Sequence, residues 1–213
     1  MFFDQSSEPI DRRIATGLHK LGLAMKQQSW VLANDEGVSP TQGQILAALS
    51  LEGELSGSEL SARLGITLPT ISDSTRVLVD KGLVVKHPDP RHPRASLIAL
   101  TERGRRVATR VRSWPDFLAS AAGALNEAEQ AVFLSGLVKM LRDLQHNGQI
   151  PTNRMCVTCT SFRPNVHDEP TPHHCAFVDA PMATRHLRVD CDEHAEAEPA
   201  LQDATWRRFT GAD

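Results

Sequence analysis

The feature that most constrains the fold is the order of segments in the middle of the chain. Residues 56–65 and 67–82 each show the apolar spacing of a short helix, and Gly65 ends the first of them at a tight turn. Two β-rich runs, 83–86 and 95–100, then flank the polar, proline-rich sequence HPDPRHPR. This order predicts a helix-turn-helix followed by a β-hairpin with a stiff cationic tip, whose prolines are expected to prevent pairing there.

Longer helical patterns lie on both sides of this segment. Apolar residues at helical spacing predict helices over residues 8–34, from a segment opening at 39–41, over 101–124 and over 126–147. Pro115 is expected to kink the third of these helices, because proline cannot donate a helical hydrogen bond. The fold class is therefore mainly α with a small β-wing: a winged helix-turn-helix flanked by long helices.

The charge is unevenly distributed along the chain. The formal net charge is −3, yet residues 66–112 contain ten Lys or Arg against four Asp or Glu, which leaves −9 for the rest. A basic segment inside an acidic protein is expected of a surface that faces nucleic acid. A solvated face without a partner is the alternative that charge alone leaves open.

The second short helix and the wing carry the candidate DNA-binding residues. Thr67 is the expected N-cap and Pro69 lies in the first turn, while the outer face offers groups that suit base edges and phosphates. Arg94, near the hairpin tip, suits an adjacent minor groove. The full predicted set is Thr67, Pro69, Thr70, Ser72, Asp73, Arg76, Lys86, Arg91, His92 and Arg94.

Several of these residues also have a purely structural interpretation. Thr70 and Ser72 are equally typical of an ordinary helix surface, and Arg91 suits a salt bridge with Asp89 as well as a phosphate. Asp73 only accepts hydrogen bonds, so it would read a cytosine amino group or repel incorrect sites.

Over residues 8–147 the chain resembles the MarR family of bacterial transcriptional regulators. The most specific resemblance is in the wing, where family members carry Asp-x-Arg-Asp-x-Arg and then Leu-Thr-x-x-Gly. His92 replaces the second Asp, which puts a titratable group where that Asp usually anchors the wing. The matching positions are Asp89, Arg91 and Arg94, followed by Leu100, Thr101 and Gly104.

The resemblance implies an obligate homodimer, in which the first helix and the last two helices form the dimerisation region. It also implies a sequence-specific repressor that binds a pseudo-palindromic DNA operator with one winged unit per half-site. Family members bind small aromatic or lipophilic acids in the cleft beside the dimerisation helices. His19, Trp30 and Trp114 are candidates for lining that effector site, or else for ordinary dimer core.

All four cysteines lie between residues 156 and 191, with the spacing Cys-x2-Cys-x15-Cys-x15-Cys. The chain has no apolar run of 18 residues, and its first residues do not resemble a secretory signal, so we expect a cytoplasmic protein. Thiols in that reducing compartment indicate metal ligation rather than disulfides. The predicted metal ligands are Cys156, Cys159, Cys175 and Cys191.

Four thiolates suit either one tetrahedral zinc ion or a [4Fe-4S] cluster. Zinc is slightly favoured as the commoner metal, although structural zinc sites often use two close cysteine pairs and this chain has one. One close pair followed by two isolated cysteines is loosely similar to high-potential iron–sulfur proteins. His173, His174 and His194 flank the cysteines as substitute ligands or as surface groups.

The chain is therefore expected to have two parts: residues 1–150, the winged helix-turn-helix and dimerisation domain, and residues 151–213, a loop-rich, metal-stapled extension with a flexible tail. In that tail, Trp206 and Phe209 are candidates for docking against the rest of the protein. We expect no enzyme activity, because nucleophile motifs and phosphate loops are missing and four thiolates leave zinc no open position. The metal centre would be structural or would sense redox state or metal. Two alternatives remain: a regulator responding to small aromatic compounds with a purely structural metal, and a metal-trafficking or zinc-dependent protein that does not bind DNA.

Overall fold

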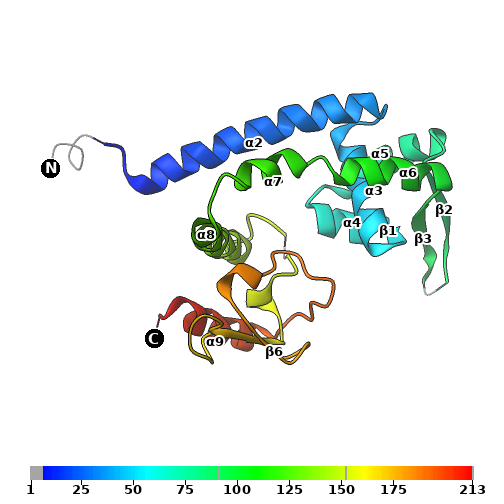
Figure 1. The fold of residues 1–213 in the computed structure, drawn as a ribbon. Helices are drawn as coiled ribbons and strands as arrows, with labels where there is room; N and C mark the ends of the chain where they lie inside the picture. The colour runs from blue at the N-terminus through cyan, green and yellow to red at the C-terminus, as the bar shows by residue number, and fades with distance from the viewer. Residues whose placement is uncertain (1–6, 91, 152, 213) are drawn as a thin grey trace. The chain divides into compact units, whose positions relative to one another are not determined.

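The structure is a computed structural model that describes residues 7–90, 92–151 and 153–212. It divides into two compact units, Met1–Ala121 and Ala122–Asp213, which we call the winged unit and the cysteine unit (Figure 1). The division falls earlier in the chain than residue 150, because the helix over 127–146 packs with the cysteine-rich segment. No helix in the described part of the chain is long and apolar enough to cross a membrane.

The winged unit contains six helices and a three-stranded antiparallel sheet among its described residues (Figure 1). The helices are α2 (Ile10–Asp35), α3 (Pro40–Glu52), α4 (Gly57–Leu64), α5 (Leu68–Asp80), α6 (Glu102–Arg112) and α7 (Asp116–Ala122). The strands are β1 (Leu55–Ser56), β2 (Val84–Asp89) and β3 (His92–Leu100), in the order β1-β3-β2. The predicted helix-turn-helix and hairpin are confirmed, whereas β1 was not predicted because two residues carry no periodic signal.

The wing is paired closer to its tip than the sequence suggested. Pro88 lies opposite Ser96, and Asp89 lies opposite His92 after a break in register. The expectation that prolines prevent pairing near the tip was wrong. Strand β2 is at the edge of the sheet, where a proline without an N–H group is tolerated.

The predicted helix over 101–124 is divided into α6 and α7 around Pro115. The preceding residue, Trp114, is 7% exposed and packs into the core. Its ring lies against Gly43 of α3, where an added Cβ would come within 2.3 Å of the ring. The break therefore turns a large aromatic side chain inward and ends the winged core.

The core of the winged unit joins the three short helices to the sheet. The largest completely buried side chains are Ile45, Leu46, Leu60, Ile71, Leu78 and Val84. Capping boxes fix the start of α3 at Ser39 and of α4 at Ser56. The positions at which these two helices begin are therefore determined by local sequence.

The cysteine unit is more ordered than the loop-rich extension that the sequence predicted. It contains α8 (Glu127–His146), the 3-10 helices η1 (Cys156–Thr158) and η2 (Thr184–His186), and α9 (Pro199–Thr210). A small antiparallel sheet has the order β4 (Phe162–Arg163), β5 (His173–Cys175), β6 (Ala180–Met182).

The C-terminal tail is part of the core of the cysteine unit, so the prediction that it is flexible was wrong, whereas Trp206 and Phe209 dock as the alternative had it. Phe209 of α9 is 9% exposed and its ring contacts the rings of Phe162 and Trp206. On the other side of this core, Val138 of α8 packs in the same cluster as Met155. Two helices thus supply the apolar surface that the segment between the cysteines lacks.

Candidate nucleic-acid interface and four-cysteine cavity

Helix α5 is positioned by its cap and by one buried face. The Thr67 hydroxyl accepts a hydrogen bond from the Thr70 N–H at 3.4 Å, which confirms Thr67 as the N-cap. Ile71, Thr75 and Leu78 are buried, and the Thr75 hydroxyl donates to the Ile71 carbonyl at 2.7 Å. The opposite face of the helix is consequently directed to solvent.

The residues predicted to contact DNA are on that exposed face. The described exposed members on α5 and its cap are Thr67, Pro69, Thr70, Ser72, Asp73 and Arg76. The Thr67 and Thr70 hydroxyls lie 2.9 Å apart, so both take part in the cap. Arg76 forms a 3.1 Å ion pair with Asp73 one turn earlier. Asp73 therefore also holds the Arg76 guanidinium.

A groove separates α5 from the wing. Its volume is about 360 Å³, and Ser72 of α5 and Lys86 of β2 both line it. Ser58 of α4 and Ser96 of β3 also line the groove and are exposed. The sequence analysis did not single out these two serines, because their position follows from the pairing of the sheet.

At the wing tip, His92 replaces the expected Asp and contacts a buried carboxylate. Its Nδ1 lies 3.4 Å from Oδ2 of Asp89, which is 3% exposed, while the His92 side chain is 74% exposed. Arg91 lies outside the described residues, and so does the side chain of Arg94. The roles assigned to these two arginines therefore stay predictions.

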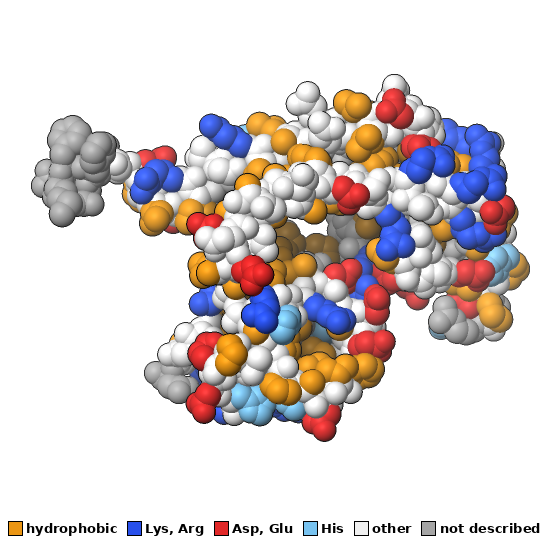
Figure 2. Space-filling view, viewed as in Figure 1, with side chains coloured by type: hydrophobic (Ala, Val, Ile, Leu, Met, Phe, Trp, Pro, Cys, Tyr) orange, Lys and Arg blue, Asp and Glu red, His pale blue; other side chains and the backbone are white. Residues whose placement is uncertain are grey.

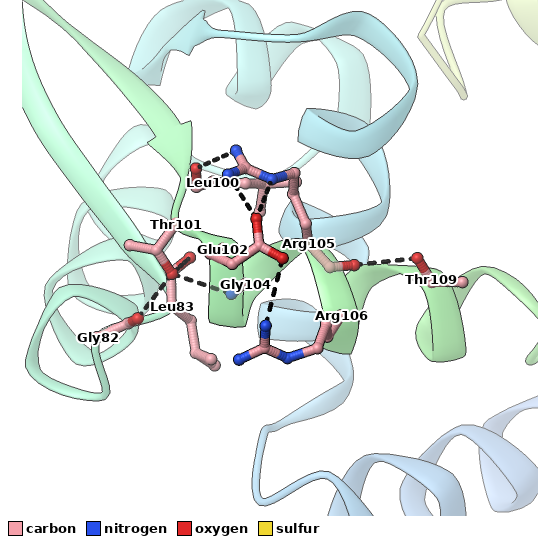
Figure 3. A network of polar contacts seen from close by, with 9 residues as sticks. All are labelled: Gly82, Leu83, Leu100, Thr101, Glu102, Gly104, Arg105, Arg106 and Thr109. Carbon is pink, nitrogen blue, oxygen red and sulfur yellow. Dashed lines mark hydrogen bonds and ion pairs between the residues drawn. The ribbon is translucent and has the colours of Figure 1, made fainter.

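A polar network around Thr101 joins the end of α5 to the wing and to α6 (Figure 3). The Thr101 hydroxyl donates to the carbonyls of Gly82 at 2.8 Å and Leu83 at 3.2 Å, and it accepts from the Gly104 N–H at 2.9 Å. An added Cβ on Gly104 would lie 1.9 Å from the Leu83 carbonyl oxygen. The Leu-Thr-x-x-Gly sequence thus fixes the orientation of α5 relative to the wing.

Arginines near this network are held by the protein itself. Arg105 donates to the Glu102 carboxylate at 2.9 Å and to the Leu100 carbonyl at 3.2 Å, and Arg106 donates to Glu102 at 3.2 Å (Figure 3). The hydrogen bonds and charge of Arg105 lower the pKa of Glu102. Arg103 donates to the Lys81 carbonyl at 3.0 Å. Arg103 and Arg105 therefore have intramolecular partners.

Basic side chains are gathered on the winged unit. Figure 2 shows Lys and Arg side chains clustered over the end of this unit where α5 and α6 lie. The sequence excess of positive charge over residues 66–112 is thus a surface feature. A polar helix face, a groove and the surrounding basic side chains together suit the binding of a double-stranded nucleic acid.

In the cysteine unit, the four cysteines line a single cavity of about 180 Å³. The backbone N–H of Cys156 donates to the Arg188 carbonyl at 3.1 Å, and that of Cys191 donates to the Arg154 carbonyl at 3.0 Å. These two hydrogen bonds bring the first and last cysteines together, and Cys175 enters from β5. All four thiols are free, with no disulfide between them.

Three of the four sulfur atoms lie near N–H donors. The Arg188 backbone N–H is 3.3 Å from Sγ of Cys156, and the Ser161 N–H is 3.5 Å from Sγ of Cys159. The Arg188 guanidinium lies 3.6 Å from Sγ of Cys191. These donors stabilise sulfur atoms that carry negative charge.

Burial raises the pKa of the Cys156 thiol, the Arg188 N–H opposes that shift, and negative charge on the other three cysteines raises the pKa further. In the metal-free protein, ionisation of one thiol in the cavity therefore makes ionisation of Cys156 less favourable. A bound metal reverses this preference, because coordinated thiols are deprotonated.

The three histidines that flank the cysteines occupy different places. His194 lines the cavity, and its Nε2 lies 3.0 Å from the Thr158 hydroxyl. His173 is buried and accepts a hydrogen bond from the Asn165 N–H, and burial lowers its pKa. His174 lies between His167 and Asp179, at 3.2 Å from each. Within the described chain, no three His, Cys, Asp or Glu side chains converge as ligands of one metal ion.

The residues proposed for an effector site do not share an environment. Trp114 belongs to the winged core, whereas His19 is exposed on α2 and Trp30 is 57% exposed there. Trp114 is therefore better explained by packing against Gly43 than by ligand binding.

Comparisons with known proteins agree with this geometry. Residues 36–95 match the sequence model of the MarR family. The uncharacterized protein Rv2011c of Mycobacterium tuberculosis is 32% identical over 101 residues, which cover 47% of this chain and 69% of that protein.

Solved structures share the fold. MepR of Staphylococcus aureus in its DNA-binding conformation is 25% identical, with a TM-score of 0.55 over 62% of this chain and 98% of that chain. A MarR variant from E. coli complexed with operator DNA is 21% identical, with a TM-score of 0.52 over 63% of this chain and 99% of that chain.

Proposed function

Because this chain belongs to the MarR family, we propose that it is a DNA-binding transcriptional regulator that acts in the cytoplasm as a homodimer. Each winged unit would place α5 in the major groove of one half-site of a pseudo-palindromic operator, with the wing against the flanking backbone. Steric competition with transcription at such an operator makes repression the expected outcome.

The observation that carries this proposal is the groove between α5 and the wing. Ser72 and Lys86 face it from the two elements that would touch DNA, and both side chains are exposed. Lys86 suits a phosphate, whereas Ser72 suits a base edge or a phosphate. The polar face of α5 adjoins this groove, and basic side chains cluster over the same end of the winged unit.

The proposed homodimer is supported by apolar surface on α2. This helix has 26 residues, and Ala33 is its one buried residue among those described. Its large exposed apolar side chains are Ile10, Ile14, Leu21, Leu23, Trp30 and Val31. A helix that exposes so many apolar residues is expected to be covered by a protein partner, and a second copy of the chain is that partner in our proposal.

The cysteine unit would add a metal centre at Cys156, Cys159, Cys175 and Cys191. The support for this part is the meeting of all four thiols at one cavity, with N–H donors at three of the sulfur atoms. Metal ligation would fix the loops that pack against α8, so the centre would act as a staple or as a sensor of redox state or metal.

DNA binding can be tested by fluorescence anisotropy with the promoter region of the protein's own gene over a range of salt concentrations. We expect binding to weaken steeply as salt rises, and Lys86→Ala to reduce the salt slope by about one. Arg76→Ala should weaken binding roughly tenfold if it contacts a base edge. Lys20→Ala on α2 is the matched control and should bind like the wild type.

Salt-insensitive binding, or none, would contradict the proposal and favour a metal-handling protein. If Lys20→Ala and Lys86→Ala lose equal DNA affinity, then binding depends on the net charge of the protein and not on the groove.

A further inference from the structure

We propose that the four-cysteine cavity binds a [4Fe-4S] cluster rather than a single zinc ion. This inference rests on the metal-centre part of the proposed function and is independent of DNA binding. It also reverses the slight preference for zinc, which rested on zinc being the commoner metal. Three features of the cavity carry it: its volume, the meeting of four thiols there and the composition of the walls.

The volume of the cavity is the first feature. At about 180 Å³ it is far larger than a single ion requires. One water molecule needs roughly 10–15 Å³ of such space, and a metal ion surrounded by four sulfur atoms needs no more. A cluster of eight iron and sulfur atoms would fill the space that one zinc ion would leave unfilled.

The meeting of the thiols is the second feature. All four cysteines line the same cavity. A [4Fe-4S] cluster takes one thiolate for each of its four iron atoms, so four thiols around one cavity of this volume match the ligand set of a cluster.

The walls of the cavity are the third feature. Apart from the cysteines, the lining includes the apolar side chains of Phe162, Phe177, Val178, Pro181 and Met182. Phe162 is 2% exposed and Met182 7%, whereas Phe177 and Val178 are more than half exposed at the rim. An apolar wall shields inorganic sulfide from water, and the backbone N–H groups of Arg188 and Ser161 donate to the sulfur atoms of Cys156 and Cys159.

The proposed ligation is a simple exchange. Each cysteine thiol releases its proton to solvent, and its sulfur forms one bond to one iron of a preformed [4Fe-4S] core, in place of a ligand from the donor of the cluster. Four protons leave, four iron–sulfur bonds form, and no electron changes hands. Cys156, Cys159, Cys175 and Cys191 would each hold one iron atom, so histidine is not required as a ligand.

The test is metal analysis of the full-length protein, produced in iron-supplied bacteria and purified without oxygen. Iron, acid-labile sulfide and zinc are counted per chain, and the visible spectrum is recorded before and after reduction with dithionite. We expect about four iron and four sulfide per chain and a brown colour that bleaches on reduction. Because the wild type is measured, the result does not depend on whether a variant folds.

Variants then locate the site. Cys175→Ala should lose most of the iron and sulfide, while Leu201→Ala, on the exposed side of α9, should keep both. X-ray absorption at the iron edge should show both sulfur and iron neighbours, which a set of adventitious single iron ions would lack.

A colourless protein with about one zinc per chain would overturn the proposal, and so would a metal-free protein. Iron that survives Cys175→Ala would also overturn it. The anisotropy assay with promoter DNA is read separately, so loss of the cluster proposal and loss of the DNA-binding proposal give different results.

Discussion

Gly104 illustrates how much one residue determines in the winged unit. It lies in the first turn of α6 against the Leu83 carbonyl, at a distance that leaves no room for a side chain (Figure 3). The position of this glycine in the motif was evident from the sequence. The reason that no larger residue fits there is evident only from the structure. Backbone proximity between residues 21 positions apart cannot be read from local periodicity.

Replacing this glycine should destabilise the winged unit. Gly104→Ala would force α6 away from Leu83, at a cost of about 1–3 kcal/mol, as for other overpacked sites. Urea unfolding of the wild type and the variant measures the difference. Gly17→Ala on α2 is the control, because no atom lies within 4 Å of the added Cβ, and it should be neutral or stabilising. Equal stability of Gly104→Ala and wild type would contradict the close approach.

Asp73 gives a second prediction for a single residue. Its ion pair with Arg76 lies on the exposed face of α5, so the carboxylate both holds the arginine and repels phosphate. Asp73→Asn should therefore bind nonspecific DNA more tightly and discriminate less between operator and random sequence. Anisotropy titrations with the two DNA molecules measure the ratio of the affinity for the operator to the affinity for random sequence. If this ratio rises in the variant, Asp73 does not contribute to specificity in this way.

The ion pair between Glu36 and Arg110 gives a pH prediction. Arg110 Nη2 donates to Glu36 Oε2 at 2.6 Å, and this hydrogen bond lowers the pKa of Glu36 below its ordinary value. A lowered pKa in the folded state means that the stabilisation is present above the unfolded pKa of about 4.3 and is lost as pH falls through the folded pKa.

We therefore expect Glu36→Gln to be slightly less stable than the wild type at pH 7, with the difference shrinking below about pH 4.3. Thermal unfolding of both proteins across that range measures the effect. A difference that grows as the pH falls would have the wrong sign for this account.

At the scale of elements, the sequence predicted most of the winged unit and little of the cysteine unit. Helices α2 to α5 were expected from apolar spacing and caps, and the predicted role of Thr67 as the N-cap of α5 is confirmed. Strand β1 and the small sheet of β4, β5 and β6 were not expected, because strands of two or three residues are defined by their partners. Helix α9 was missed because the acidic, then mildly basic composition of the residues after His194 suggested a flexible tail.

The packing of α9 can be tested by removing its buried anchor. Phe209 contacts Phe162 and lies beneath the Lys139 ammonium group of α8, 5.9 Å from the ring centre. Phe209→Ala should destabilise the cysteine unit by about 3–5 kcal/mol. Hydrogen exchange of backbone amides in α9 and η1 reports the stability of the cysteine unit separately from that of the winged unit. Leu201→Ala, at an exposed position of α9, is the control. Unchanged protection would mean that α9 is not part of the core.

The four cysteines were predicted as ligands from their spacing, whereas the proposal for the nature of the centre rests on the cavity. Spacing specifies how many thiols are available and in what order, and it cannot specify how far apart their sulfur atoms lie. The apolar cavity walls come from β4, β6 and the turn between β5 and β6, which spacing does not describe.

At the scale of the whole molecule, the chain joins two units with separate cores and separate chemistry. The winged unit carries the polar helix, the groove and the basic surface. The cysteine unit carries the thiols and includes α8, so the proposed metal ligation would be linked to the packing of that helix within one core. If the proposed metal centre is present, its loss is expected to loosen α8 as well as the loops.

The most direct test of the central claim is a hydroxyl-radical footprint of the full-length protein on its own promoter region. A homodimer with one winged unit per half-site predicts two symmetric protected segments, centred about one helical turn (~10–10.5 base pairs) or a multiple of it apart. Protection that lacks two-fold symmetry, or no protection at low salt, would contradict the account.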